Sequence, residues 1–79
     1  MKARVTVMLK SGILDPQGEA IKNALNSLGY NEVSSIRQGK VIEINLNETS
    51  EEKAKNNIEK MCKKLLANTV VENYQIEII

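Results

Sequence analysis

The hydrophobic residues of this chain change their period along the sequence, and the order of those periods constrains the fold more than any other feature. In residues 2–10, 40–47 and 70–79, apolar and polar side chains alternate. Successive side chains of a strand point to opposite faces of a sheet, so this alternation predicts three strands, each buried on one side. A weaker fourth strand is predicted over residues 32–38, where the apolar anchors are irregularly spaced and a Gln-Gly pair typical of a hairpin follows.

Two helices are predicted between these strands, because apolar residues recur there at helical spacing. The first begins after Asp15, which can cap the free N–H groups and is followed by proline, and it ends at Gly29. The second begins at Thr49 or Ser50, and Thr49 with Glu52 has the spacing of a capping box. The stripes expected to be buried are Ile21, Ala24, Leu25 and Leu28 in the first helix and Ile58, Met61, Cys62, Leu65 and Leu66 in the second.

These segments give the order β-α-β-β-α-β within a single domain spanning residues 1–79. Each apolar helix stripe needs a sheet to cover it, and four strands are too few to close a barrel. We therefore expect an α+β fold, a two-layer sandwich in which two helices lie on one face of an antiparallel four-stranded sheet. This is a ferredoxin-like plait or a close variant of it.

The chain contains no histidine, and this argues against most catalytic and metal-binding functions. Histidine is the commonest general base and metal ligand. The one cysteine, Cys62, falls in the apolar stripe of the second helix, where a buried thiol is inert. We therefore expect no catalytic, cofactor-binding or metal-binding residue on this chain, and we expect it to act by binding other protein chains.

The overall charge and hydropathy exclude further classes of partner. The net charge is +1 and the only aromatic residues are two tyrosines, which does not suit a nucleic-acid-binding protein. No apolar run approaches the length of a membrane span, and the first residues do not resemble a signal peptide. We therefore expect a cytoplasmic protein that binds neither nucleic acid nor a membrane.

Two short segments, residues 15–18 and 37–40, contain residues that a purely structural role does not explain. Gly18 falls in the first turn of the predicted helix, where glycine costs up to about 1 kcal/mol relative to alanine, so another backbone, a partner or a ligand is expected close to it. The candidate contacts with partner chains are Asp15, Gln17, Gly18, Arg37, Gly39 and Lys40.

The apolar last strand suits pairing with a second copy of the chain, and the candidate residues for self-association are Tyr74, Ile76, Ile78 and Ile79.

Four runs of residues strongly resemble the PurS family. They are Leu-Asp-Pro-Gln-Gly at residues 14–18, Tyr-Asn-Glu-Val at 30–33, Arg-Gln-Gly-Lys at 37–40, and the longer run from Met61 to Tyr74 that contains Leu-Leu-Ala-Asn-Thr. The likeness extends over nearly the whole chain and is least familiar over residues 47–57.

The resemblance implies a small accessory subunit of phosphoribosylformylglycinamidine (FGAM) synthase. That enzyme converts formylglycinamide ribonucleotide, glutamine and ATP to formylglycinamidine ribonucleotide, glutamate, ADP and phosphate in purine biosynthesis. Glutamine is hydrolysed on the PurQ subunit, ATP and magnesium bind the PurL subunit, and PurS dimers bridge the two and assist ammonia transfer. The alternative left open by the residues alone is a small-molecule-sensing regulatory domain of the ACT type, which shares the same element order.

Overall fold

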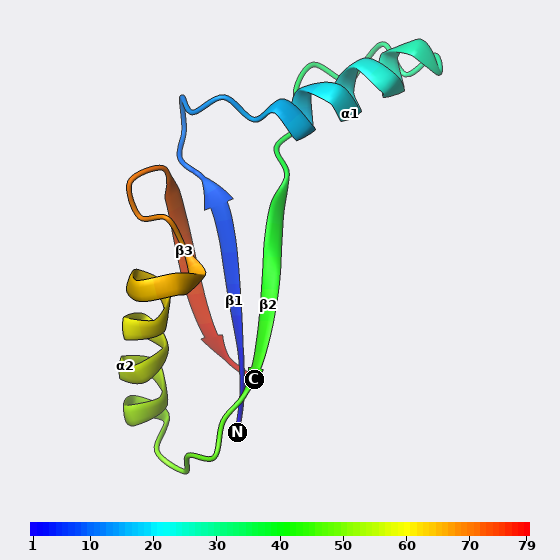
Figure 1. The fold of residues 1–79 in the computed structure, drawn as a ribbon. Helices are drawn as coiled ribbons and strands as arrows, with labels where there is room; N and C mark the ends of the chain where they lie inside the picture. The colour runs from blue at the N-terminus through cyan, green and yellow to red at the C-terminus, as the bar shows by residue number, and fades with distance from the viewer.

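The computed structural model describes all 79 residues and has the shape of a small sheet with a helical arm at one end (Figure 1). The elements in chain order are β1 (Lys2–Leu9), α1 (Pro16–Ser27), β2 (Gly39–Asn45), α2 (Glu51–Met61), the π-helical turn η1 (Cys62–Leu66) and β3 (Glu72–Ile78). The sheet is antiparallel, and β1 lies between β2 and β3. Val5 at its centre is paired with Ile42 on one side and Ile76 on the other.

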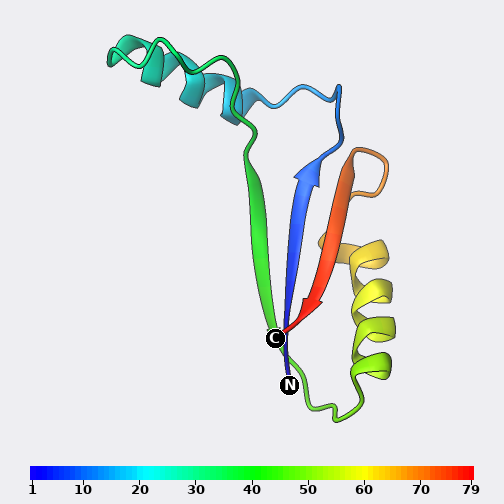
Figure 2. The same cartoon turned by 180° about the vertical axis from the view of Figure 1, so that it is seen from behind.

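The core lies between the sheet and α2. The inward row of β1, which is Ala3, Val5 and Val7, is almost completely buried, as are Ile58 and Cys62 from the helical side. In both ribbon views α2 runs beside β3 and leaves β2 at the far edge (Figures 1 and 2). The predicted strands at both ends of the chain and the second predicted helix are thus confirmed, together with the α+β class.

The predicted fourth strand is wrong, because residues 32–38 form no ladder and the sheet has three strands. Val33 and Ile36 are three residues apart, so a strand could not place both on one face. This segment instead runs back along α1 (Figure 1). The side-chain amide of Asn26 donates to the carbonyl of Val33, at 3.3 Å. The predicted hairpin at Gln38-Gly39 is also absent, because no strand precedes β2 there and β2 pairs only with β1.

The prediction that both helices cover one face of the sheet is wrong as well, because α1 projects beyond the end of the sheet (Figure 2). The radius of gyration is 16.0 Å, whereas a compact domain of this length has about 12 Å. Along α1, Leu28 is 74% exposed and Ile21 is 40% exposed. The prediction failed because it required the apolar stripe of α1 to be covered within the same chain. We call α1 and the segment that returns from it, residues 16–38, the arm.

The second helix begins as expected but ends differently. Ser50 is its cap, with its hydroxyl accepting from the N–H of Lys53, so the predicted capping box that used Thr49 is wrong. At the other end, the N–H of Ala67 donates to the carbonyl of Cys62 in a wide π-helical turn. The predicted stripe is wrong at Met61 and Leu65, which are exposed, and it omitted Ala54, which is completely buried in the first half of α2.

Candidate functional site

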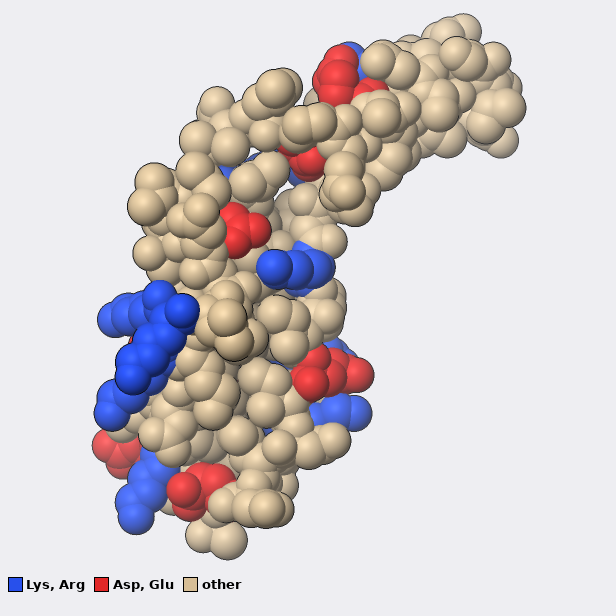
Figure 3. Space-filling model, viewed as in Figure 1, with Lys and Arg blue, Asp and Glu red and all other residues tan.

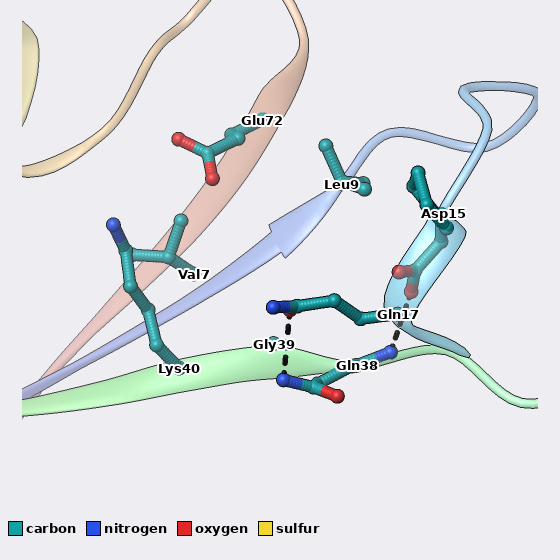
Figure 4. A pocket seen from close by; sticks show the side chains of 9 residues that line it. Val7, Leu9, Asp15, Gln17, Gln38, Gly39, Lys40 and Glu72 are labelled. Carbon is teal, nitrogen blue, oxygen red and sulfur yellow. Dashed lines mark hydrogen bonds between the residues drawn. The ribbon is translucent and has the colours of Figure 1, made fainter. Parts of the chain in front are cut away.

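A cleft of about 340 Å³ opens where the arm leaves the sheet (Figure 4). Its walls come from four elements: the end of β1, the start of α1, the entry into β2 and the start of β3. The lining residues are Val7, Leu9, Asp15, Pro16, Gln17, Gln38, Gly39, Lys40 and Glu72. Residues far apart in the sequence therefore meet here, and four of the six predicted contact residues are among them.

Asp15 connects the two chain segments at which the arm begins and ends. One carboxylate oxygen, Oδ1, accepts from the N–H of Gly18 at 2.9 Å and caps α1 as predicted. The other, Oδ2, accepts from the N–H of Gln38 at 2.7 Å, which the sequence did not indicate. Hydrogen bonds from Gln38 and then Gly18 hold the pKa of Asp15 below its usual value of 3.8, because they stabilise the charged form.

Arg37 and Gln17 complete this junction. The guanidinium of Arg37 donates to the carbonyl of Leu9 at the end of β1. The side-chain amide of Gln38 donates to Oε1 of Gln17 at 2.9 Å (Figure 4). We call Asp15, Gln17, Arg37 and Gln38 the arm clamp, because their contacts fix the base of the arm to the sheet and to itself.

Gly18 is needed for a close approach, but the backbone that approaches it belongs to the same chain. It is buried, and a Cβ there would collide with the carbonyl oxygen of Ile36 and lie 2.8 Å from Oδ2 of Asp15. We therefore expect alanine at this position to loosen the arm, whereas helix propensity alone predicts that it stabilises the free subunit.

Gly39 and Lys40 lie at the start of β2. A Cβ on Gly39 would come within 2.5 Å of the carbonyl oxygen of Val7, so glycine is required by the close pairing with β1. Lys40 is paired with Val7 and is exposed, and its ammonium forms no ion pair. Of the three charged residues among the predicted contacts, Lys40 is therefore the one whose side chain makes neither a hydrogen bond nor an ion pair within the chain.

The predicted self-association residues lie on β3 and at its end. Tyr74, Ile76 and Ile78 are half-buried on the face that packs toward the core, and Ile79 is 48% exposed. The hydroxyl of Tyr74 donates to Oε1 of Glu59 on α2 at 2.5 Å. This hydrogen bond, with some burial, raises the pKa of Tyr74 to about 12. Tyr74 thus contacts α2 of its own chain, and the role of all four residues between copies of the chain stays a prediction.

The remaining chemistry-bearing groups do not converge. Cys62 is fully buried, and burial followed by the nearby carboxylate of Glu59 raises the pKa of its thiol, which disfavours the reactive thiolate. No group of three or more acidic or cysteine side chains is placed to hold a metal ion. None of the helices has the length and apolar character that a membrane span requires. The arrangement offers surfaces for binding and no nucleophile beside a base.

Sequence reasoning missed two polar residues of the cleft. The sequence predicts Gln38 only as part of a turn, whereas its N–H and its side chain both contact the start of α1. Glu72 accepts from the N–H of Asn68 at 2.7 Å and borders the cleft from β3. Only the unusual Gln-Gly pair signalled a special position there, and nothing in the local sequence pointed to Glu72.

Comparison with known proteins gives consistent results over the whole chain. The family model named PurS, described as "Phosphoribosylformylglycinamidine (FGAM) synthase", matches residues 2–79. The PurS subunit of FGAM synthase from Methanocaldococcus jannaschii is 47% identical over 77 residues, covering 98% of this chain and 93% of the relative. The Bacillus subtilis subunit is also 47% identical over 77 residues, with 98% and 90% covered.

Solved structures agree. The B. subtilis PurS structure has a TM-score of 0.86 at 47% identity, with 96% of this chain and 94% of that chain covered. A structure described as PurLQS from Thermotoga maritima matches with a TM-score of 0.86 at 34% identity, covering 96% and 93%. These likenesses favour the PurS interpretation over the ACT-type alternative.

Proposed function

Because this chain belongs to the PurS family and is a subunit of phosphoribosylformylglycinamidine synthase, a ligase of purine biosynthesis, we propose that it serves as the small non-catalytic bridge of that enzyme. Its partners in this proposal are PurL and PurQ chains, as the PurLQS structure of the Thermotoga relative suggests. Glutamine is then hydrolysed on PurQ, ATP and magnesium bind PurL, and the bridge assists ammonia transfer in the cytoplasm.

The observation that carries this proposal is the arm. Only eight of the 79 residues are buried, and the apolar stripe of α1 has no cover from the sheet. A subunit that leaves Leu14, Ile21 and Leu28 exposed has surface to gain from association, because burying apolar area is the main favourable term in protein binding. The arm clamp holds this surface away from the sheet, where other chains can reach it.

Reconstitution from separate subunits tests the bridging role. We expect no glutamine hydrolysis or FGAM synthesis from the chain alone, because it has no histidine and its thiol is buried. We expect glutamine-dependent synthesis when it is combined with PurL and PurQ. Full glutamine-dependent activity from PurL and PurQ without the chain would contradict the proposal, as would hydrolysis by the chain alone.

Lys40 is the clearest test of the cleft as a partner contact. Lys40→Ala removes a free charge, so we expect an unchanged melting temperature and weaker assembly with PurL or PurQ. The matched control is Lys2→Ala at the far end of the sheet, where the ammonium lies 3.6 Å from Glu43. If both variants assemble like the unmodified chain, the cleft is only structural. Arg37→Ala is not suited to this test, because Arg37 belongs to the arm clamp.

We also propose that two copies of the chain associate through the arm. The inner side chains of β2, Ile42 and Ile44, and that of Leu46 directly after the strand are only half-buried because α2 lies over β1 and β3. The apolar stripe of the arm from a second copy fits this uncovered row. In a twofold dimer each copy places its arm on the sheet of the other copy. The arm then supplies the second helix that the sequence predicts on this face of the sheet.

Sedimentation at micromolar concentration tests this association. We expect at least a dimer, and we expect Leu28→Ser to shift the mass toward the monomer. Asn23→Ser, at an exposed polar position of α1, is the control that should leave the mass unchanged. Deleting Ile79 tests the chain end in the same assay. A monomeric mass for the unmodified chain would refute the proposal.

A further inference from the structure

Four lysines follow one another along the outward face of α2 and η1: Lys53, Lys60, Lys63 and Lys64. All four are exposed, and so are Asn56 and Asn57 between them. The opposite face carries the buried Ala54, Ile58 and Cys62. Over 11 residues the row is about 16 Å long. We call the four lysines the basic stripe, and Figure 3 shows lysine side chains gathered on the side of the molecule where α2 lies.

The charges of the stripe are poorly compensated, unlike those on the sheet. On the sheet, Arg4 lies 3.4 Å from Glu43 and 3.2 Å from Glu77. Within the stripe only Lys63 has a carboxylate nearby, at 3.9 Å from Glu59. Lys53, Lys60 and Lys64 form no ion pair. The free subunit therefore holds neighbouring positive charges on one face without partners of opposite sign.

Helix stability accounts for only part of this pattern. Lysines in the last turns favour the negative end of the helix dipole, which explains Lys60, Lys63 and Lys64. Lys53 is the third residue of α2, directly after Glu51 and Glu52, and a positive charge is unfavourable at that end. The stripe thus continues past the point where it helps the helix.

An exposed apolar side chain adjoins the stripe. Leu65 follows Lys64 in the sequence and is 84% exposed, the largest exposed fraction among the large hydrophobic residues of the chain. A protein interface usually has apolar anchors at its centre and a polar, solvent-accessible rim, where charged side chains can lie. A polyanion is a poorer fit, because the net charge is only +1 and the stripe contains no aromatic residue for stacking.

We infer that the basic stripe and Leu65 form a docking surface for an acidic, partly apolar face of one of the two larger synthase subunits. This inference rests on the proposed function, and it concerns a surface separate from the arm and its cleft. The lysines direct and orient the approach of the acidic face, and Leu65 supplies the apolar contact.

The test compares two lysines of the same helix. Lys60→Glu reverses a charge within the stripe. Lys55→Glu makes the same change beside Glu59 and Tyr74, in the groove between α2 and β3. Binding of each variant to purified PurL and PurQ is measured at about 0.05 M salt and again at about 0.5 M salt. Charges are screened strongly only at the higher concentration. Melting curves of the free variants verify that both are folded.

We expect Lys60→Glu to weaken binding about tenfold at low salt and much less at high salt, and Lys55→Glu to change it less than about twofold. Leu65→Ser should weaken binding at both salt concentrations. If the unmodified chain binds neither subunit, the proposed function fails as well. If it binds and Lys60→Glu binds equally well, or both charge reversals weaken binding equally, the docking surface alone is refuted. Tighter binding of the unmodified chain to duplex DNA or anionic vesicles than to either subunit would also overturn it.

Discussion

The two helices of this chain have similar lengths, 12 residues in α1 and 11 in α2, yet they are held in place by different forces. α2 is anchored by packing, with Ala54 and Ile58 completely buried against the sheet. α1 has a single buried residue, Gly18, and its position depends on hydrogen bonds of the arm clamp. One half of the chain is thus stabilised by its own core, and the other by polar contacts at its base.

This difference separates the stability of the subunit from the geometry of its exposed surface. Packing against α2 sets the free energy of unfolding, since buried apolar area is the dominant stabilising term. The arm clamp sets the direction in which an uncovered apolar stripe points. Changes in the core should therefore unfold the chain, and changes in the clamp should loosen the arm while the sheet remains folded.

The largest expected effect comes from the core. Ile58→Ala leaves a cavity beneath α2, so we expect a loss of about 2–5 kcal/mol in the free energy of unfolding. Leu28→Ala on the exposed stripe of α1 should change it by less than about 0.5 kcal/mol. Denaturant unfolding at low protein concentration, where association does not contribute, measures both. Equal losses would mean that the arm is packed in solution.

The next effect is at the base of the arm. Gly18→Ala forces the carbonyl of Ile36 away, and overpacking of this kind costs about 1–3 kcal/mol. We expect exchange of the Gln38 N–H to accelerate roughly 5- to 150-fold while amides of β1 keep their protection. Asn23→Ala, an exposed position of the same helix, is the control for helix propensity. Unchanged exchange in Gly18→Ala would show that the contact with Ile36 is not tight.

The two halves also differ in how far the sequence predicts them. The strands at residues 2–9 and 72–78 and the buried Ile58 and Cys62 follow from periodicity, because their neighbours within the chain decide their burial. The stripe of α1 has the same helical period, but the sheet of its own chain does not cover it. Periodicity reports which side of a helix is apolar, and it does not report which chain buries it.

The site shows a similar limit. The sequence identified Asp15 as a cap and Gly18 as a position of close approach, since local backbone chemistry requires them. The hydrogen bond from the N–H of Gln38 to Asp15 spans 23 residues, and no local pattern encodes it. Arg37 is predicted as a contact with a partner chain, and no local pattern encodes its hydrogen bond to the carbonyl of Leu9, 28 residues earlier in the sequence.

A smaller effect is expected where α2 meets β3. The hydroxyl of Tyr74 keeps its proton in the folded state, with a pKa of about 12 against the usual 10, because it donates to Glu59. The raised pKa adds stability that is present below pH 10 and is lost as the pH rises toward 12. Tyr74→Phe should have a lower free energy of unfolding than the unmodified chain at neutral pH. Between pH 10 and pH 12 this free energy should fall less in the variant than in the unmodified chain. Tyrosinate absorbance of the unmodified chain minus that of the variant measures the midpoint, and a midpoint near 10 would contradict the hydrogen bond.

The smallest effect, and the most specific to the arm, is expected for Asp15→Asn. Asparagine is a good helix cap, so the oxygen of its amide can still accept from the N–H of Gly18. Its amide nitrogen is a donor and cannot accept from the N–H of Gln38, which loses its partner. We therefore expect α1 to remain helical while the Gln38 amide exchanges faster and the sheet is unaffected.

The acid response separates this clamp from the cap. The pKa of Asp15 is lowered in the folded state, so its contribution is present above the ordinary value of 3.8 and is lost as the pH falls through the lowered one. In the unmodified chain the NMR signal of the Gln38 N–H should therefore titrate below pH 3.8. Over the same pH range this N–H should lose its protection against hydrogen exchange, once the exchange rates are corrected for the intrinsic effect of pH. In Asp15→Asn that step should be absent, because no carboxylate remains at the base of the arm. If the Gln38 signal titrates equally in both chains, another group holds the returning segment, and Glu72, which borders the same cleft, is the first to replace.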